Sequence, residues 1–258
     1  MINMNNEENV FYAKINLDLI KEYIFNLMLI NDEICLNINN NGFYIMSIDS
    51  SNVSMIKSYL SKNEFINYIL KDSSNIKIGL DLLKIYDILN NYNQNLNIDL
   101  YINTIRQKLE IHIENMIYKT SLLDVSVIKN ETKDLSIQFN NEIYINGSEL
   151  KKALKIADKI NDFIIFELNK NKLYIKTKNE DEDFSLYLSS NIIKNKNKDS
   201  LVSSIYSIEY LLNLSRGIGK LDNIILSIGQ DYPLQIKYNI KNKDCHFIYI
   251  LAPRIEPK

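Results

Sequence analysis

One local pattern occurs four times along the chain and constrains the fold more than any other feature. Each copy reads as a short apolar strand, a capping residue, and a helix whose apolar residues recur at three- and four-residue spacing. The copies begin at Ala13, Ile78, Ile143 and Ser203, roughly 60 to 67 residues apart, which indicates an internal repeat. The predicted helix caps are Asp18 or Asn16, Asp81, Ser148 and Ser207.

Between these helices, polar and apolar residues alternate, as in EICLNI and KLEIHI in the first half and KLYIKT and LQIKYNI in the second. Such alternation is typical of antiparallel strands with one buried face. Runs of strands interrupted by one helix per repeat predict an α+β fold, with helices on one side of antiparallel sheets. We expect two similar domains at 1–124 and 138–258, joined by a more polar connector at 125–137.

Composition narrows the class of protein. The 258 residues include 30 basic and 32 acidic side chains, and the net charge of −2 neither demands nor excludes a polyanionic partner. The two cysteines, Cys35 and Cys245, are expected to be reduced thiols of an intracellular protein. No apolar run approaches the ~20 residues that span a bilayer, and the polar, acidic N-terminus does not resemble a signal peptide. We therefore expect a protein that stays inside the cell.

Residues suited to catalysis or metal binding are sparse. His112 and His246 are the two histidines, and both lie in strand-like alternation, so a zinc site lacks ligands. The segment SRGIGK at 215–220 lacks phosphate-loop spacing and fits a helix that ends at Gly217. We expect no catalytic residue, no metal and no cofactor. The acidic run at 180–183 leaves two alternatives open: the cation site of a metal-dependent hydrolase, or the solvated tip of a hairpin.

The helix predicted in SELKKALKIADKI has the clearest charge pattern. Lys152, Lys155 and Lys159 align on one stripe, opposite an apolar face formed by Leu150, Ala153, Leu154, Ala157 and Ile160. Such a stripe neutralises nucleic-acid phosphates without reading bases, or it is an ordinary exposed helix face.

The segment IDSSNVSMI at 48–56 places Asp49, Ser50, Ser51 and Asn52 between apolar flanks. From these residues alone, the segment fits either a binding site or a capped turn whose flanks pack in the core.

The segment IMSIDSSNVSMIKSYL, together with the end PLQIKYNI…CHFIYILAPRIE, resembles the proliferating cell nuclear antigen family of DNA sliding clamps. The resemblance spans almost the whole chain. It implies two clamp domains per chain and three chains in a ring, with helices lining the hole and strands forming the outer wall. It also implies a non-enzymatic DNA polymerase processivity factor in the nucleus, the archaeal cytoplasm or a viral replication site. A specialised subunit of a heterotrimeric ring is the alternative.

The expected partners are sequence-independent duplex DNA, further copies of the chain and client proteins: DNA polymerase, clamp loader, flap nuclease and ligase. The resemblance implies DNA contacts at Lys21, Lys84, Lys152, Lys155, Lys159 and Arg216. Glu22, Asp87 and Asn90 occupy positions where the family often has lysine. We therefore expect DNA contact mainly in the second half of the chain.

The resemblance also implies a hydrophobic pocket for short client motifs, formed by Ile48, Asn52, Val53, Met55, Val127, Ile128, Tyr232, Pro233, Ile250, Ala252 and Pro253. Asp49, Ser50 and Ser51 are expected chiefly to fix the turn. Asn52 stands where many members have His, and the connector lacks the usual L-G-I-P pattern. Client motifs are therefore expected to differ from the usual ones or to bind more weakly. Subunit contacts are expected at Tyr118 on one edge and at Leu154 and Phe184 on the facing side.

Overall fold

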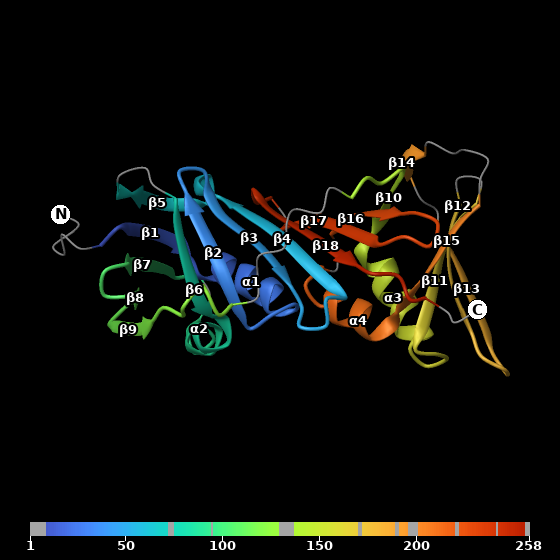
Figure 1. The fold of residues 1–258 in the computed structure, drawn as a ribbon, viewed down its shortest axis with the longest axis horizontal. Helices are drawn as coiled ribbons and strands as arrows, with labels where there is room; N and C mark the ends of the chain where they lie inside the picture. The colour runs from blue at the N-terminus through green and yellow to red at the C-terminus, as the bar shows by residue number, and fades with distance from the viewer. Residues whose placement is uncertain are drawn as a thin grey trace. The chain divides into compact units, whose positions relative to one another are not determined.

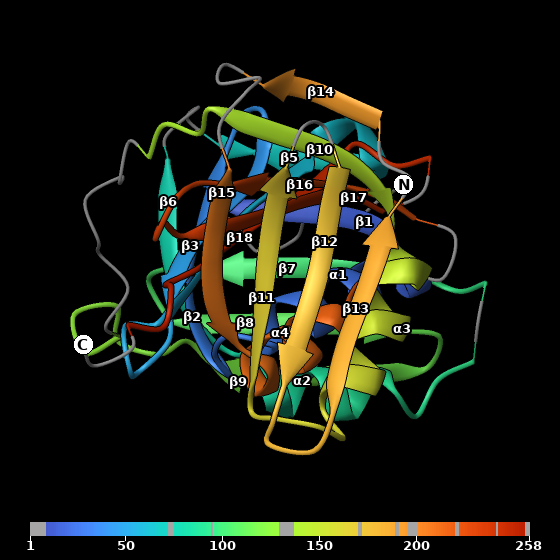
Figure 2. The same ribbon diagram turned by 90° about the vertical axis from the view of Figure 1, so that its right-hand side faces the viewer.

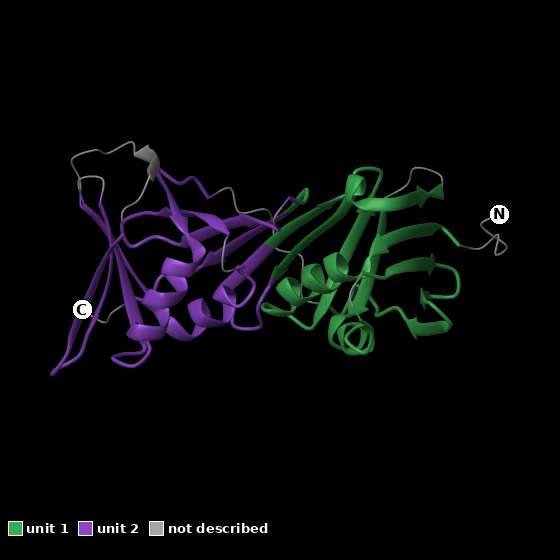
Figure 3. Cartoon of the chain, turned by 180° about the vertical axis from the view of Figure 1, so that it is seen from behind, with its two compact units in different colours: residues 1–47, 57–131, 243–245 green, residues 48–56, 132–242, 246–258 purple. Residues whose placement is uncertain are grey.

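A computed structural model describes residues 9–71, 75–93, 95–128, 137–169, 172–188, 191–195, 201–219, 222–240 and 242–255, with the backbone alone for 191–195. The chain divides into two compact units (Figure 3). Unit 1 comprises residues 1–47, 57–131 and 243–245, and unit 2 comprises residues 48–56, 132–242 and 246–258. The short segments 48–56 and 243–245 therefore belong to a different unit from their neighbours in sequence. Most of the predicted connector, residues 129–136, lies outside the described residues.

The first half of the chain contains two helices among its strands (Figure 1). The elements are β1 (Phe11–Asn16), α1 (Leu17–Met28), β2 (Glu33–Asn39), β3 (Gly42–Ile48), β4 (Ser54–Ser61), the 3-10 helix η1 (Lys62–Glu64), β5 (Phe65–Leu70), β6 (Ile76–Asp81), α2 (Leu82–Leu89), β7 (Asn97–Asn103), β8 (Lys108–Ile113) and β9 (Met116–Ser121). One sheet has the order β5-β1-β7-β8-β9, and the other strands follow the order β6-β2-β3-β4.

The second half repeats this succession. Its elements are β10 (Asn141–Asn146), α3 (Gly147–Ala157), β11 (Phe163–Asn169), β12 (Lys172–Lys178), β13 (Asp183–Leu188), β14 (Asn191–Asn195), β15 (Val202–Ser207), α4 (Ile208–Ser215), β16 (Asn223–Ile228), β17 (Leu234–Asn239) and β18 (Cys245–Leu251). The strand orders are β14-β10-β16-β17-β18 and β13-β12-β11-β15, and Figure 2 shows the second of these as a row. Each strand occupies the position of the strand nine places earlier in the chain, which confirms the predicted internal repeat.

The predicted helix caps agree with the structure at three of four positions, and two of these three make a side-chain capping bond. Asn16 Oδ1 accepts a hydrogen bond from Leu19 N at 3.2 Å, and Asp81 Oδ1 accepts one from Lys84 N at 3.1 Å. The cap predicted at Ser148 is wrong. Helix α3 begins at Gly147, and Asn146 Oδ1 accepts from Ser148 N at 2.8 Å, because the amide reaches the first free N–H groups. Ser207 precedes α4 as expected, but its side chain makes no capping bond.

The helices pack in pairs within each unit, α1 with α2 and α3 with α4. The rings of Phe25 and Tyr86 lie 5.9 Å apart across the first pair. Antiparallel sheets and four α-helices among the described residues confirm the predicted α+β class. In that same part of the chain, no helix has the length and apolar character needed to cross a bilayer.

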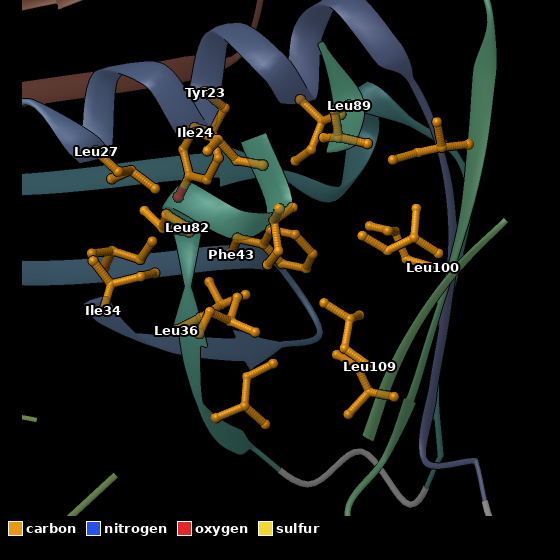
Figure 4. A pocket seen from close by; sticks show the side chains of 18 of the residues that line it. Tyr23, Ile24, Leu27, Ile34, Leu36, Phe43, Leu82, Leu89, Leu100 and Leu109 are labelled. Carbon is orange, nitrogen blue, oxygen red and sulfur yellow. The ribbon is translucent and has the colours of Figure 1, made fainter. Parts of the chain in front are cut away.

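The core of unit 1 contains a cavity of about 50 Å³ between the helices and the sheets. Its lining is apolar and includes Ile24 and Leu27 of α1, Leu89 of α2, and Leu100 and Leu109 on the sheet, as Figure 4 shows. Side chains that line such a void lose contacts with neighbouring atoms. At ~24 cal/mol per Å³, the void lowers the free energy of unfolding by about 1 kcal/mol.

We predict that Leu100→Phe raises the free energy of unfolding by about 1 kcal/mol, because the larger ring fills this void. Urea unfolding of the variant and the parent protein measures the change. Ile105→Phe is the control, because Ile105 is 76% exposed and its substitution is expected to change stability by less than ~0.5 kcal/mol. A loss of stability in Leu100→Phe would show that the ring does not fit the space.

Candidate binding surfaces

Helix α3 separates apolar and basic residues on two faces. Leu150, Ala153, Leu154 and Ala157 are fully buried within unit 2. Lys152 and Lys155 are exposed on the helix, and Lys159 is exposed in the turn that follows it. Within the described residues, the three ammonium groups of this lysine stripe make no hydrogen bond or ion pair. They are therefore available to a polyanion.

Arg216 caps the C-terminal end of α4, the helix that packs against α3. Its guanidinium Nη1 donates to Asn213 Oδ1 at 3.3 Å and remains exposed. Lys151 Nζ donates to the carbonyl of Ile218, which ties α3 to the segment after α4. The structure thus places Arg216 on the same helix pair as the lysine stripe.

The unit 1 helices carry a more balanced charge. Lys84 Nζ lies 2.6 Å from Asp81 Oδ2 in an ion pair, which raises the pKa of Lys84. Lys21 is half-buried, and its ammonium donates to the carbonyl of Tyr92 at 3.5 Å. Glu22 and Asp87 are exposed beside these lysines. Both expected cations of unit 1 therefore have local partners, unlike the lysine stripe.

Asp49 organises the turn in segment 48–56. Its Oδ1 accepts from the backbone N–H groups of Val53 and Ser54, each at 2.8 Å, and Asn52 adopts a φ of 58°. Asn tolerates this left-handed backbone better than most residues. The expected turn-fixing role belongs to Asp49, whereas Ser50 and Ser51 are exposed and make no such bond among the described residues. Their short hydroxyls point to solvent at the tip of the turn.

Two further segments of unit 2 carry expected partner residues. Tyr232 and Pro233 follow β16, and Ala252 and Pro253 follow β18; all four are half-buried. The N–H of Ala252 donates to the carbonyl of Val53 at 2.8 Å, so the segment after β18 lies directly beside the turn. These residues, with Ile48, Asn52 and Val53, form what we call the turn surface.

Two residues expected in the pocket do not present surface. Met55 is 3% exposed and Ile250 is 6% exposed. Each lies in a run of three buried residues, 54–56 on β4 and 249–251 on β18, so both faces of these strands are covered there. In the structure they support the turn surface from beneath.

The described start of the connector lies in unit 1. Leu123 N donates to Gly79 O at 2.9 Å, and a Cβ on Gly79 would lie 2.5 Å from Leu123 O and 2.7 Å from a methyl of Ile128. Gly79 therefore permits the close approach of this segment to β6. Val127 is 73% exposed, whereas Ile128 is half-buried over Gly79.

The expected subunit contacts fall at two sheet edges. Tyr118 lies on β9, the last strand of the five-stranded sheet of unit 1, and Phe184 lies on β13, the edge of the four-stranded sheet of unit 2. Leu154 is different: it is fully buried on the apolar face of α3. A subunit contact at Leu154 stays a prediction.

The acidic run at 180–183 is a hairpin tip. Asn179 Oδ1 accepts from the N–H groups of Asp181 and Glu182 at 2.8 and 2.7 Å, which closes the turn without a cation. No group of three metal-binding residues occurs in the described part of the chain. The two histidines lie on different strands, β8 and β18. His112 pairs with Glu110 at 3.3 Å, and His246 pairs with Asn239 at 2.8 Å.

Sequence reasoning missed the side chains that hold the turn surface in place. Tyr206 and Ser204 on β15 and Tyr210 on α4 bond to it, over separations of up to 161 residues. The sequence offered one indication: the alternating segment VSSIYS places Ser204 and Tyr206 on the same, buried face of the predicted strand.

The fold is a duplicated α+β architecture of antiparallel sheets and paired helices. No model of a known protein family matches the sequence. The chain is 30% identical over 247 residues to the DNA polymerase sliding clamp of Methanosarcina barkeri, covering 96% of this chain and 99% of that protein. It is 29% identical to the clamp of Methanocella arvoryzae with the same coverage.

Solved structures show the same fold. The A. fulgidus PCNA bound to the C-terminal region of FEN-1 has a TM-score of 0.87 at 24% identity, covering 96% of this chain and 100% of that chain. PCNA from Thermococcus kodakaraensis has a TM-score of 0.85 at 23% identity, covering 95% and 100%. The chain belongs to the DNA polymerase sliding clamp family. It is accordingly a processivity factor and not an enzyme.

The burial of Met55 generates a prediction. Met55→Ala should lower the free energy of unfolding by about 3 kcal/mol, because it leaves a cavity beneath the turn surface. Val127→Ala removes a side chain that is 73% exposed and should change stability by less than ~0.5 kcal/mol. Urea unfolding distinguishes the two. Equal effects would contradict the assignment of Met55 as support and Val127 as surface.

Proposed function

We propose that this chain forms one third of a ring that encircles duplex DNA and tethers replication and repair enzymes to it. The single observation that carries the proposal is the strand order of the internal repeat. Strand β18 is a hydrogen-bonded neighbour of β4, but the corresponding strands β9 and β13 end their sheets. Among the end strands of the described sheets, β9 and β13 are thus the two whose counterparts in the repeat pair with each other.

Pairing between chains fits these edges. Each edge strand leaves a row of backbone N–H and C=O groups without a strand partner, which favours association with a complementary strand. If β9 of one chain pairs with β13 of the next, the contact repeats the pairing that β18 and β4 already make. Such a head-to-tail contact closes into a ring when its rotation allows. Three chains would supply four α-helices each to the hole, with Tyr118 and Phe184 at each contact.

DNA contact is proposed at Lys152, Lys155, Lys159 and Arg216, with a smaller contribution from Lys21 and Lys84. The unpaired ammonium groups of the lysine stripe support this assignment. Phosphate contacts of this kind are independent of sequence, so a threaded ring can slide. The grip then depends on closure of the ring more than on affinity.

Client binding is proposed at the turn surface of unit 2, with Val127 and Ile128 as further contacts in unit 1. The surface combines half-buried apolar groups with the exposed amide of Asn52, which suits a short hydrophobic and aromatic motif. That a related clamp was solved with the C-terminal region of FEN-1 supports a flap nuclease as one client. We propose DNA polymerase, clamp loader and ligase by the same family resemblance. Tethering raises the effective concentration of a weakly bound client at its template.

We also propose that residues 1–124 and 138–258 act as the two clamp domains, with 125–137 as the connector. Segment 48–56 then lies within the first domain in the sequence, although it packs as part of unit 2.

Charge reversal tests the DNA-facing helix. Lys152→Glu, Lys155→Glu and Lys159→Glu combined should abolish most retention on circular DNA and reduce the salt slope of binding by about two to three, because each neutralised phosphate contributes ~0.9. Retention on nicked circular DNA at several salt concentrations measures both.

The matched control reverses three exposed lysines outside the four α-helices, Lys62, Lys172 and Lys178, and so changes net charge equally. This control should retain DNA nearly as well as the parent protein. Equal losses in the two triple variants would reduce the effect to net charge and would contradict the lysine stripe.

Light scattering tests the ring. The purified chain should have a mass close to three times 30.2 kDa. Combining Tyr118→Ala with Phe184→Ala should shift micromolar protein toward the single-chain mass, because each edge loses an aromatic side chain. Tyr44→Ala, on the central strand β3, should leave the mass unchanged. A single-chain mass for the parent protein would overturn the homotrimer and favour a subunit of a mixed ring.

A further inference from the structure

We propose that one continuous segment, β15 with α4, positions the turn surface, and that the hydroxyls of Tyr206 and Tyr210 hold its loop and its turn. This inference rests on the proposed function, because it assigns the support of the proposed client site. Three pieces of chain form that surface in unit 2: the turn at 48–54, the loop at 229–233 and the tail at 252–255. Each of them bonds to residues 203–210.

The loop is held by β15. Asp231 N donates to Ser203 O at 3.0 Å, and Tyr232 N donates to Ser204 Oγ at 2.9 Å. Tyr206 Oη donates to Tyr232 O at 2.7 Å. Ser204 and Tyr206 are 1% and 0% exposed, and burial raises the pKa of Tyr206, so its hydroxyl remains a proton donor. Both backbone groups of Tyr232 are thus held by buried side chains of one strand.

The tail is held by the same strand. Arg254 N donates to Ile205 O at 2.7 Å, and the Arg254 guanidinium lies 2.8 Å from Asp162 Oδ2. Two residues earlier, Ala252 N bonds to Val53 O and joins the tail to the turn. The tail therefore connects β15 with the turn through backbone bonds.

The turn is held by α4. Tyr210 Oη donates to Asp49 Oδ2 at 3.3 Å, while Asp49 Oδ1 accepts from Val53 N and Ser54 N. One carboxylate thus receives three donors and links the helix to the turn. Removal of the Tyr210 hydroxyl leaves the two turn bonds in place but frees the carboxylate from the helix.

A common support has a consequence for binding. A client pays less ordering entropy when the three pieces are already fixed relative to one another. Arg216, a proposed DNA contact, caps the same α4. The client surface and this DNA contact therefore share one element of unit 2.

Two variants test the positioning role, Tyr210→Phe and Tyr206→Phe, each of which removes one oxygen atom. The matched control is Tyr144→Phe on β10, whose hydroxyl makes no hydrogen bond within the described residues. The probe is a fluorescein-labelled synthetic peptide with a short hydrophobic motif ending in two aromatic residues. We expect each test variant to bind the peptide about fivefold more weakly, the effect of one lost hydrogen bond, and Tyr144→Phe to bind as the parent protein does.

A second readout separates positioning from stability. Amide NMR resonances of Val53 and Ser54 should shift in Tyr210→Phe, and that of Tyr232 should shift in Tyr206→Phe. Retention on circular DNA should stay unchanged. Parent-like peptide affinity in both variants, or unshifted amides, would overturn the inference. If the parent protein itself fails to bind the peptide, the proposed client site fails, and the amide shifts alone then decide whether the two hydroxyls position these segments.

Discussion

Backbone pairing at sheet edges is the constraint on which the rest of this structure depends. An antiparallel edge strand leaves a row of N–H and C=O groups that need water or another strand. The duplicated strand order gives β18 and β4 one another as neighbours, whereas β9 and β13 each pair on one side only, with β8 and β12. The proposed ring is inferred from the open backbone edges of these two strands more directly than from any side chain.

Much of the fold could be predicted because it is encoded locally. Alternation of apolar residues marks the strands, and the recurring strand-cap-helix pattern marks the repeat. The caps at Asn16 and Asp81 follow from their side-chain chemistry. Ser148 has the residue type of a helix cap, but Asn146 lies two positions earlier. There its side-chain amide oxygen accepts a hydrogen bond from the free N–H of Ser148. The exchange of segment 48–56 between compact units had no local signal.

The candidate surfaces also include some features that local sequence patterns predict and others that they do not. The lysine stripe was predictable because helical spacing alone places Lys152 and Lys155 opposite the buried face. The same spacing places Leu154 on the buried face of α3. Tyr206 and Tyr210 escaped notice because their partners lie far away in sequence. From sequence alone, a tyrosine in a strand or helix is assigned to the hydrophobic core, because the acceptor of its hydroxyl is not known.

Charge is distributed unequally between the two helix pairs, and the proposed mechanism explains why this is tolerable. Among the described residues, Lys152, Lys155 and Lys159 of the lysine stripe make no ion pair, whereas in unit 1 Lys84 is held by Asp81 and Lys21 has acidic Glu22 beside it. A protein that holds DNA by affinity would lose much of its grip through such compensation, because each phosphate contact contributes to binding. A threaded ring needs only enough positive potential to keep the duplex near one helix pair of each chain. Fewer contacts also mean fewer bonds to break at each step, so the neutral helices of unit 1 favour sliding over retention at one place.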